Sequence, residues 1–367
     1  MNIYVTSEQI GLEGYWITDI LAGIGKEALK KNLSVIDYNG KNLEIGDEFI
    51  RPLVLAVGYS AQWMESTCNH MTSHGIQPIL VTSAQSADTE MLSFSGIVSF
   101  GLKKAMYNVL NYLVLSRRNR IAFFGGHGET HADNVKAAEF LALSHHFGLN
   151  INKSDIYMDT SLSDCAKTFE MSMHRYNAVI CSSDAAAVFL LKWLEERGVR
   201  VPEDTFIIGF GNSEVSEAIT PSITTLESNY VELGRQAVKL HQFLLHNPDI
   251  ACSSVLVDCP FIERNSTGSL KFRKAPPQSR HDGRMPLYDT DPDILMILQT
   301  EELLRMWDDI DRSIINGLLQ NKTIVSIADG LFISVSAVKY RIKKMLTAAN
   351  LQSKDELVHI IKKYNVL

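Results

Sequence analysis

The strongest constraint on the fold is a regular alternation that runs from residue 1 to about residue 262. Short runs rich in β-branched residues are separated by longer segments with helical periodicity. Strands that alternate with helices of about 10 to 15 residues form βαβ units, in which helices cover both faces of a parallel sheet. This part of the chain is therefore predicted to have an α/β fold. The predicted strands are 2–6, 33–38, 53–57, 78–81, 97–100, 120–124, 178–181 and 205–208, and the predicted helices include 16–30, 61–74, 102–115, 131–146, 161–173 and 185–197.

A polar stretch at residues 116–119 (SRRN) interrupts this alternation, and a new strand begins at Arg120. A polar pause between two similar α/β halves predicts two lobes with a cleft between them. We place the lobe boundary near residues 117–120, with later crossovers between the lobes. Ligands of such sheets bind outside the carboxyl ends of the strands, so the cleft is the expected ligand site.

The pattern changes after residue 268. Residues 269–293 have no sustained period and contain several prolines, which is typical of an exposed linker. After Pro292 helix formers dominate and no strand pattern returns, so residues 294–367 are predicted to form an all-α domain behind the two-lobed domain at 1–268. The first helical segment, 293–307, is too apolar for a free helix, and we expect it to dock on the core or on a neighbouring subunit.

Composition excludes several protein classes. The hydrophobic fraction of 46% is too high for a disordered chain. No run of about 18 apolar residues and no signal sequence occurs, so a cytoplasmic protein without a membrane partner is expected. The five cysteines are scattered without CxxC spacing, which favours reduced thiols over disulfides or a metal site.

The charge of the chain is distributed unevenly. The net charge is −7, yet residues 334–363 carry 7 basic and only 2 acidic side chains. Within this region Ser334 or Ser336 can cap a helix whose apolar face contains Val338, Ile342 and Met345. The opposite face carries Lys339, Tyr340, Arg341, Lys343 and Lys344.

A short apolar helix at about 324–331 precedes this basic helix, and a capping box, Ser353-x-x-Glu356, announces another helix after it. Two short helices joined by a tight turn, the second basic outside and apolar inside, are typical of a helix-turn-helix that enters the major groove of DNA. The alternative is a small helical bundle with a solvated basic face. Because the turn, the helix cap and the basic residues all lie at the positions expected for a helix-turn-helix, we favour double-stranded DNA as a partner.

The same segment resembles the LuxR-type output domain of response regulators. The matching residues are Ile327-Ala328, Leu331, Ile333-Ser334, Val338-Lys339, Leu346, Leu351, Ser353 and Glu356-Leu357-Val358. The resemblance implies that Lys339, with Arg341 or Lys343, contacts DNA, and that Ser334, Ser336, Tyr340 and Lys344 border the contact. The chain departs from the pattern at Asn321, usually Gly, and at Ala337, usually Thr.

The α/β part resembles the effector domain of the lactose/galactose repressor family, which is related to periplasmic sugar-binding proteins. Six motifs carry the resemblance and keep their order: 178–187, 198–204, 207–210, 220–225, 233–238 and 262–267. The family normally begins with its own helix-turn-helix, whereas here the first predicted strand starts at Asn2. We therefore expect the sensor to come first and the DNA-binding output last.

The resemblance also implies a small-molecule effector, such as a sugar or a related polar metabolite. Two family ligand contacts are replaced, because Gly211 and Asn212 follow the strand where Asp is usual and Asn134 stands in place of Arg. The pocket is therefore not a standard sugar pocket. The remaining ligand-binding candidates are Tyr15, Trp16, Ser60, Trp63, Asn134, Asp184 and Asn212, although Tyr15 and Trp16 could equally be core residues and Asp184 a helix cap.

Other chemistries have little support. His127 and His131 flank a Gly-rich turn but do not have the HExxH arrangement of a zinc site, and residues 125–128 do not have the order of a phosphate-binding loop. The nucleophile motif GxSxG is absent, so neither an enzyme nor a cofactor is expected. The sequence thus predicts a homodimeric, ligand-responsive transcription regulator. The alternative is that the α/β domain is a degenerate interaction or dimerisation module that binds no small molecule.

Overall fold

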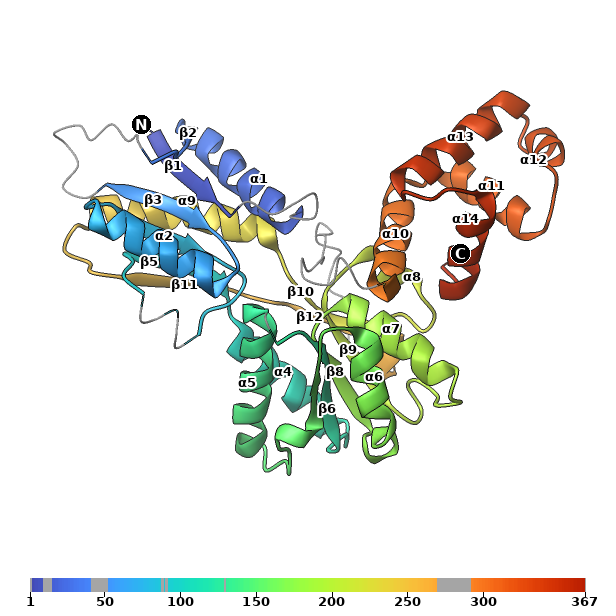
Figure 1. Ribbon diagram of the computed structural model, residues 1–367, viewed down its shortest axis with the longest axis horizontal. Coiled ribbons are helices and arrows are strands. Elements are labelled where there is room, and N and C mark those ends of the chain that lie inside the picture. The colour runs from blue at the N-terminus through green and yellow to red at the C-terminus, as the bar shows by residue number, and fades with distance from the viewer. Residues whose placement is uncertain are drawn as a thin grey trace.

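The computed structural model describes residues 2–8, 15–40, 52–86, 89, 92–128, 130–268 and 292–366. The chain forms two α/β lobes, each built on a six-stranded sheet, followed by a group of C-terminal helices beside the second lobe (Figure 1). This confirms the predicted two-lobed, parallel-rich α/β fold.

The first lobe has the strand order β11-β5-β4-β3-β1-β2, and all of its strand pairs are parallel. Alternate residues of its central strand face opposite helical layers. Leu55 packs with the layer of α1 and α9, while Ala56 packs with Met64 of α2. The elements are β1 (Asn2–Ser7), α1 (Tyr15–Lys30), β2 (Ser34–Asp37), β3 (Leu53–Val57), α2 (Ala61–Ser73), β4 (Gln77–Val81), β5 (Gly96–Phe100), α9 (Tyr230–His246) and β11 (Ser253–Val257).

The second lobe has the order β12-β10-β9-β8-β6-β7, and only β12 runs antiparallel among its described strands. Helices α4 and α5 cover one face of this sheet, and α6 and α7 cover the other (Figure 1). The elements are α4 (Leu102–Leu115), β6 (Ile121–Gly126), α5 (His131–His146), β7 (Ile156–Met158), α6 (Leu162–Glu170), β8 (Ala178–Cys181), α7 (Asp184–Glu195), β9 (Phe206–Gly211), α8 (Glu214–Ala218), β10 (Thr224–Glu227) and β12 (Phe261–Ile262).

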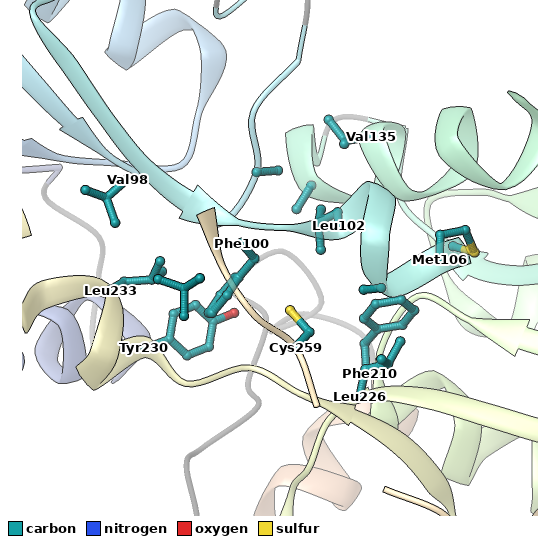
Figure 2. Close-up of a cluster of buried hydrophobic side chains, with 14 of the residues drawn as sticks. Val98, Phe100, Leu102, Met106, Val135, Phe210, Leu226, Tyr230, Leu233 and Cys259 are labelled. Atoms are coloured by element: carbon teal, nitrogen blue, oxygen red, sulfur yellow. The ribbon is translucent and has the colours of Figure 1, made fainter. Parts of the chain in front are cut away.

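The chain passes between the lobes three times, from β5 to α4, from β10 to α9 and from β11 to β12. The first crossing, between Phe100 and Leu102, corrects the predicted boundary near residues 117–120, because α4 packs on the sheet of the second lobe. Each crossover leaves the carboxyl end of a strand, so the carboxyl ends of both sheets face the opposite lobe. Figure 2 shows buried side chains from both lobes meeting at these crossovers, among them Phe100, Leu102, Phe210, Tyr230 and Cys259. One continuous apolar cluster therefore joins the two lobes.

The C-terminal region consists of α10 (Pro292–Met306), α11 (Asp309–Leu319), α12 (Ile324–Gly330), α13 (Val335–Ala348) and α14 (Lys354–Tyr364). Helix α10 packs against α7 and α8 of the second lobe and also contacts α13 and α14 (Figure 1). Its side chains Ile294, Ile297, Leu303 and Leu304 are buried in a cluster shared with the second lobe. The prediction that this helix docks on the core is thus confirmed.

Several elements were not predicted, and all of them except α9 are short. Strands β7, β10, β11 and β12 and helices α8 and α9 lie where the sequence showed only motifs or no clear period. Residues 263–268 belong to the second lobe, since the Tyr112 hydroxyl donates to Glu263 Oε1 at 2.9 Å and lies 2.9 Å from the Thr267 hydroxyl. Of the predicted linker at 269–293, residues 269–291 lie outside the described residues. No described helix is long and apolar enough to cross a membrane.

The contact between α1 and α9 yields a test of this packing. A Cβ atom added at Gly23 would come within 2.1 Å of the Val231 carbonyl oxygen, whereas a Cβ at Gly25 meets nothing within 4 Å. We expect Gly23→Ala to reduce the free energy of unfolding by about 1–3 kcal/mol, because the two backbones must separate. Gly25→Ala, two residues away on the same helix, should be neutral or stabilising by up to about 1 kcal/mol. Urea unfolding of both variants measures the difference, and equal stabilities would contradict the close packing.

Candidate nucleic-acid interface and effector site

Helices α12 and α13 lie where the sequence predicts a helix-turn-helix. Thr323 caps α12 by accepting the Ser326 N–H at 3.2 Å, and Ser334 caps α13 by accepting the Ala337 N–H at 3.1 Å. Phe332 turns the chain between them with a left-handed φ of 55°. The two capping candidates are thus distinguished, since Ser334 is the cap and the Ser336 hydroxyl lies 2.9 Å from the Ser334 hydroxyl.

The inner face of α13 is apolar as predicted. Val338, Ile342 and Met345 are buried in the same cluster as Ile327 and Ala328 of α12. This packing fixes the rotation of α13 about its axis and therefore determines which side chains point outward.

The outer face of α13 carries exposed Lys339, Tyr340, Lys343 and Lys344, with Ser334 and Ser336 exposed at its N-terminal end. The Tyr340 side chain is 69% exposed. Within the described part of the chain, none of the three lysines forms an ion pair. Their charges are therefore available to an anionic partner.

Arg341 does not share this outer face. Its Nη1 atom lies 2.8 Å from Asp308 Oδ2 and 2.8 Å from Asp311 Oδ1. The carboxylates of Asp311 and Asp308 raise the pKa of Arg341. The sequence offered Arg341 or Lys343 as the DNA contact beside Lys339; in the structure the Arg341 guanidinium joins α13 to the first turn of α11.

Two capping motifs precede and follow α13 in the chain. Asp308 and Asp311 form a capping box at the start of α11, with the spacing Asp-x-x-Asp. At α14 the predicted cap Ser353 accepts the Glu356 N–H at 3.2 Å. Glu356 itself accepts the Gln352 N–H at 2.8 Å, one residue earlier than a capping box requires.

The predicted ligand residues of the first lobe are largely part of its framework. Trp16 is only 2% exposed, and its ring lies 5.7 Å from that of Tyr59 and 5.8 Å from that of Tyr230. This favours the core role that the sequence left open. The side chain of Tyr15 lies outside the described residues.

Ser60 and Trp63 shape the turn between β3 and α2. The Ser60 hydroxyl caps α2 by accepting the Trp63 N–H at 3.3 Å and donates to Glu8 Oε1. A Cβ atom at Gly58 would lie 2.3 Å from the Trp63 ring, so the indole covers this turn closely. Both residues are therefore engaged by the protein itself.

Asp184 at the start of α7 is 1% exposed and fully bonded within the lobe. Its Oδ2 accepts the Ser213 N–H at 2.7 Å, and its Oδ1 accepts the Thr225 hydroxyl at 2.5 Å. The helix cap is Ser183, which accepts the Ala186 N–H at 3.1 Å. The cap role of Asp184 is thus corrected, because Ser183 caps α7. The ligand role stays a prediction, and in the structure the Asp184 carboxylate joins α7 to Ser213 and Thr225.

Asn212 directly follows β9 with a left-handed φ of 61°. Its Oδ1 accepts a hydrogen bond from Arg264 Nη2 at 2.6 Å, and Arg264 also donates to the Ile223 carbonyl at 2.9 Å. The amide oxygen predicted to contact a ligand is therefore bonded to the protein. The guanidinium of Arg264 lies beside the place where the related family carries an Asp.

Asn134 is the exposed member of the set in the second lobe, and its Nδ2 donates to the Gly128 carbonyl at 2.7 Å. Next to Asn134 lies a buried ion pair that was not predicted from the sequence. Lys136 Nζ lies 3.2 Å from Asp133 Oδ1 and 2.7 Å from the Ser182 carbonyl oxygen. Burial raises the pKa of Asp133, and the charge of Lys136 opposes this rise.

A pocket of about 420 Å³ lies at the crossovers, between the start of α9 and the end of β11. None of the predicted ligand residues lines it. In the described ranges no group of three His, Cys, Asp or Glu is placed to hold a metal ion. The lining residues are Glu227, Asn229, Glu232, Gln236, Val255, Leu256, Val257, Asp258 and Pro260.

Comparison with known proteins identifies what the α/β part is similar to. Residues 110–267 match the sequence model of the periplasmic binding protein-like domain. Among curated proteins, the chain is similar to the HTH-type transcriptional repressor CytR of Escherichia coli (strain K12), with 27% identity over 170 residues, which are 45% of this chain and 50% of CytR. The chain thus spans about half the length of the curated relatives it matches.

Two solved structures share the two-lobed fold. A putative transcriptional regulator LacI from Bacillus cereus subsp. cytotoxis NVH 391-98 matches with a TM-score of 0.57 at 15% identity, over 72% of this chain and 97% of that chain. The LacI family transcriptional regulator CCPA from Weissella paramesenteroides, with bound sucrose, matches with a TM-score of 0.55 at 16% identity, over 74% and 100% of the two chains. The α/β part therefore has the fold of LacI-family, periplasmic-binding-protein-like sensor domains.

The bonding of Asp184 can be tested by substitution. Asp184→Asn replaces one acceptor by an NH₂ group beside a donor, and we expect a loss of about 1–3 kcal/mol in the free energy of unfolding. Asp164→Asn, in the first turn of α6, removes a carboxylate whose ion pair with Lys167 is exposed and screened by solvent, so it should change the free energy of unfolding much less. Chemical denaturation compares the two. If Asp184→Asn left the free energy of unfolding unchanged, these hydrogen bonds would not stabilise the lobe, and a ligand role for Asp184 would be favoured.

Proposed function

We propose that this protein is a ligand-responsive, DNA-binding transcription regulator in which a two-lobed sensor acts on a C-terminal helix-turn-helix of the LuxR type. One observation carries the proposal: Lys339, Lys343 and Lys344 are exposed and without ion pairs among the described residues, on a helix whose inner face is fixed by packing. The repressor relatives of the α/β part support the same class of function.

The proposed recognition helix is α13. Its capped N-terminal end, with Ser334 and Ser336, suits a phosphate, because hydroxyls and free backbone N–H groups converge there. Lys339 and Lys343 are one turn apart and would reach phosphates or guanine edges in the major groove. Tyr340 and Lys344 would border the contact, while Arg341 keeps α13 on α11.

We further propose that the protein acts as a cytoplasmic homodimer with a sugar or a related polar metabolite as effector. A dimer would present two copies of α13 to paired half-sites. A structure with the same fold contains sucrose, which supports a polar ligand between the lobes. The proposed ligand would contact strand ends that differ from a standard sugar pocket at Asn134 and Asn212.

DNA binding is tested with duplexes that the full-length protein selects from a random pool. We expect Lys339→Ala and Lys343→Ala each to weaken binding about tenfold at low salt, since each removes a charge-assisted contact. Where the contact is to phosphate, the slope of log affinity against log salt should fall by about 0.9. Fluorescence anisotropy measures both quantities.

The control is Lys362→Ala, which removes the same charge from the exposed surface of α14. It should leave the affinity within about twofold, because its site lies on another helix. Equal effects of the three substitutions would mean that net charge alone matters, and the assignment of α13 would be wrong.

A second candidate function has its own observation. Asp184, Asn212 and Ser60 are bonded within the protein, which favours an α/β module that mediates interaction or dimerisation and binds no small molecule. A thermal-shift screen with sugars, nucleosides and amino-acid derivatives separates the two. A true ligand at one hundred times its Kd adds about 2.7 kcal/mol of stability and raises Tm by several degrees. If no compound raised Tm, a module that binds no small molecule would be favoured.

A further inference from the structure

Helix α10 makes one buried polar contact with the second lobe. Glu301, only 2% exposed, accepts the Glu214 N–H at 2.6 Å through Oε1 and the Val215 N–H at 2.5 Å through Oε2. These are the first N–H groups of α8, which have no partner within that helix. A carboxylate that accepts two backbone N–H groups is a strong and directional contact. Glu301 therefore fixes α10 to the start of α8 in both distance and angle.

The start of α8 is joined directly to the predicted effector site. Ser213, the residue before α8, donates its N–H to Asp184, and Asn212 before it is bonded to Arg264. Arg264 also donates to the Ser216 hydroxyl of α8 at 3.3 Å. A change at the carboxyl end of β9 is therefore transmitted to the N–H groups that Glu301 binds, through bonds that allow little independent movement.

Helix α10 leads directly to the proposed recognition helix. After the buried Trp307 comes Asp308, which caps α11 and, with Asp311, binds Arg341 of α13. Buried Leu303 and Leu304 belong to the cluster that also contains Val338 and Met345 of α13. The orientation of α13 therefore follows that of α10 through both an ion pair and apolar packing.

We propose that α10 couples the carboxyl end of β9 in the second lobe to the orientation of α13, with Glu301 as the positioning residue. This inference rests on the proposed function. A shift of Asn212 and Ser213 would move the two backbone N–H groups that Glu301 binds, and α10 would move with them. In a dimer, the docked α10 would set the separation of the two α13 helices and so favour correctly spaced half-sites.

The test compares two duplexes, one with both half-sites selected by the full-length protein and one cut to a single half-site. Glu301→Gln keeps the size of the side chain but loses the charge and places an NH₂ group beside backbone donors. We expect it to weaken binding of the two-site duplex about tenfold, because the two recognition helices lose their fixed separation. Binding of the single half-site should stay within about twofold, because the face of α13 is unchanged.

The matched control is Glu302→Gln, which removes the same charge from the neighbouring, half-buried position. It should leave both affinities within about twofold. Hydrogen exchange gives a second readout: the amides of Glu214 and Val215 should exchange faster in Glu301→Gln and not in Glu302→Gln, in the full chain.

The outcomes separate the two proposals. An equal loss of binding to both duplexes, or no loss to either, would overturn the role of Glu301 while leaving DNA binding intact. Unchanged exchange at Glu214 and Val215 would overturn it as well. If the unsubstituted protein bound no duplex, the proposed function would fail and this inference with it.

Discussion

The three crossovers between the lobes pass through one buried apolar cluster, and the rest of the molecule depends on this junction. Phe100 and Tyr230 come from crossovers that enter opposite lobes, and their rings pack 5.2 Å apart. Because Cys259 on the third crossover is buried in the same cluster, the three segments cannot move independently of one another. The lobes can change their relative angle only by bending all three crossovers together, which makes that angle a property of the whole sensor.

Several polar groups at the strand ends of the second lobe bind other groups of the protein. Asp184 binds Ser213 and Thr225, Arg264 binds Asn212, and Lys136 binds Asp133. Each of these charged groups thus has a partner of opposite charge or hydrogen bonds within the lobe. A ligand that bound here would have to compete with these bonds or to use groups above them, such as Asn134. The sensor therefore differs chemically from a sugar site with free charged groups, although its fold is the same.

The sequence predicted the elements that have strong periodicity and missed those that depend on tertiary contacts. The helix 102–115 and the strand 53–57 were predicted at their observed bounds, since both are long apolar patterns with clear ends. Strand β12 has two residues and is formed by pairing with β10, so no local signal announces it. At the candidate sites, the exposed lysines of α13 followed from helical spacing. The ion pairs of Arg341 with Asp308 and Asp311 could not be predicted from this spacing, because the partners are about 30 residues apart in the chain.

The distribution of charge gives the architecture a further consequence. Residues 1–293 carry 25 basic against 34 acidic side chains, so the sensor is repelled by the phosphates of DNA, whereas the region of α13 is attracted. Only a small basic face can then approach a duplex closely, and the rest of the chain opposes any other orientation. A DNA-binding unit with so few contacts would gain more from a fixed orientation than from added charge, because more lysines would strengthen binding to every sequence alike. This argues that docking of α10 on the sensor matters as much for selective binding as the side chains of α13.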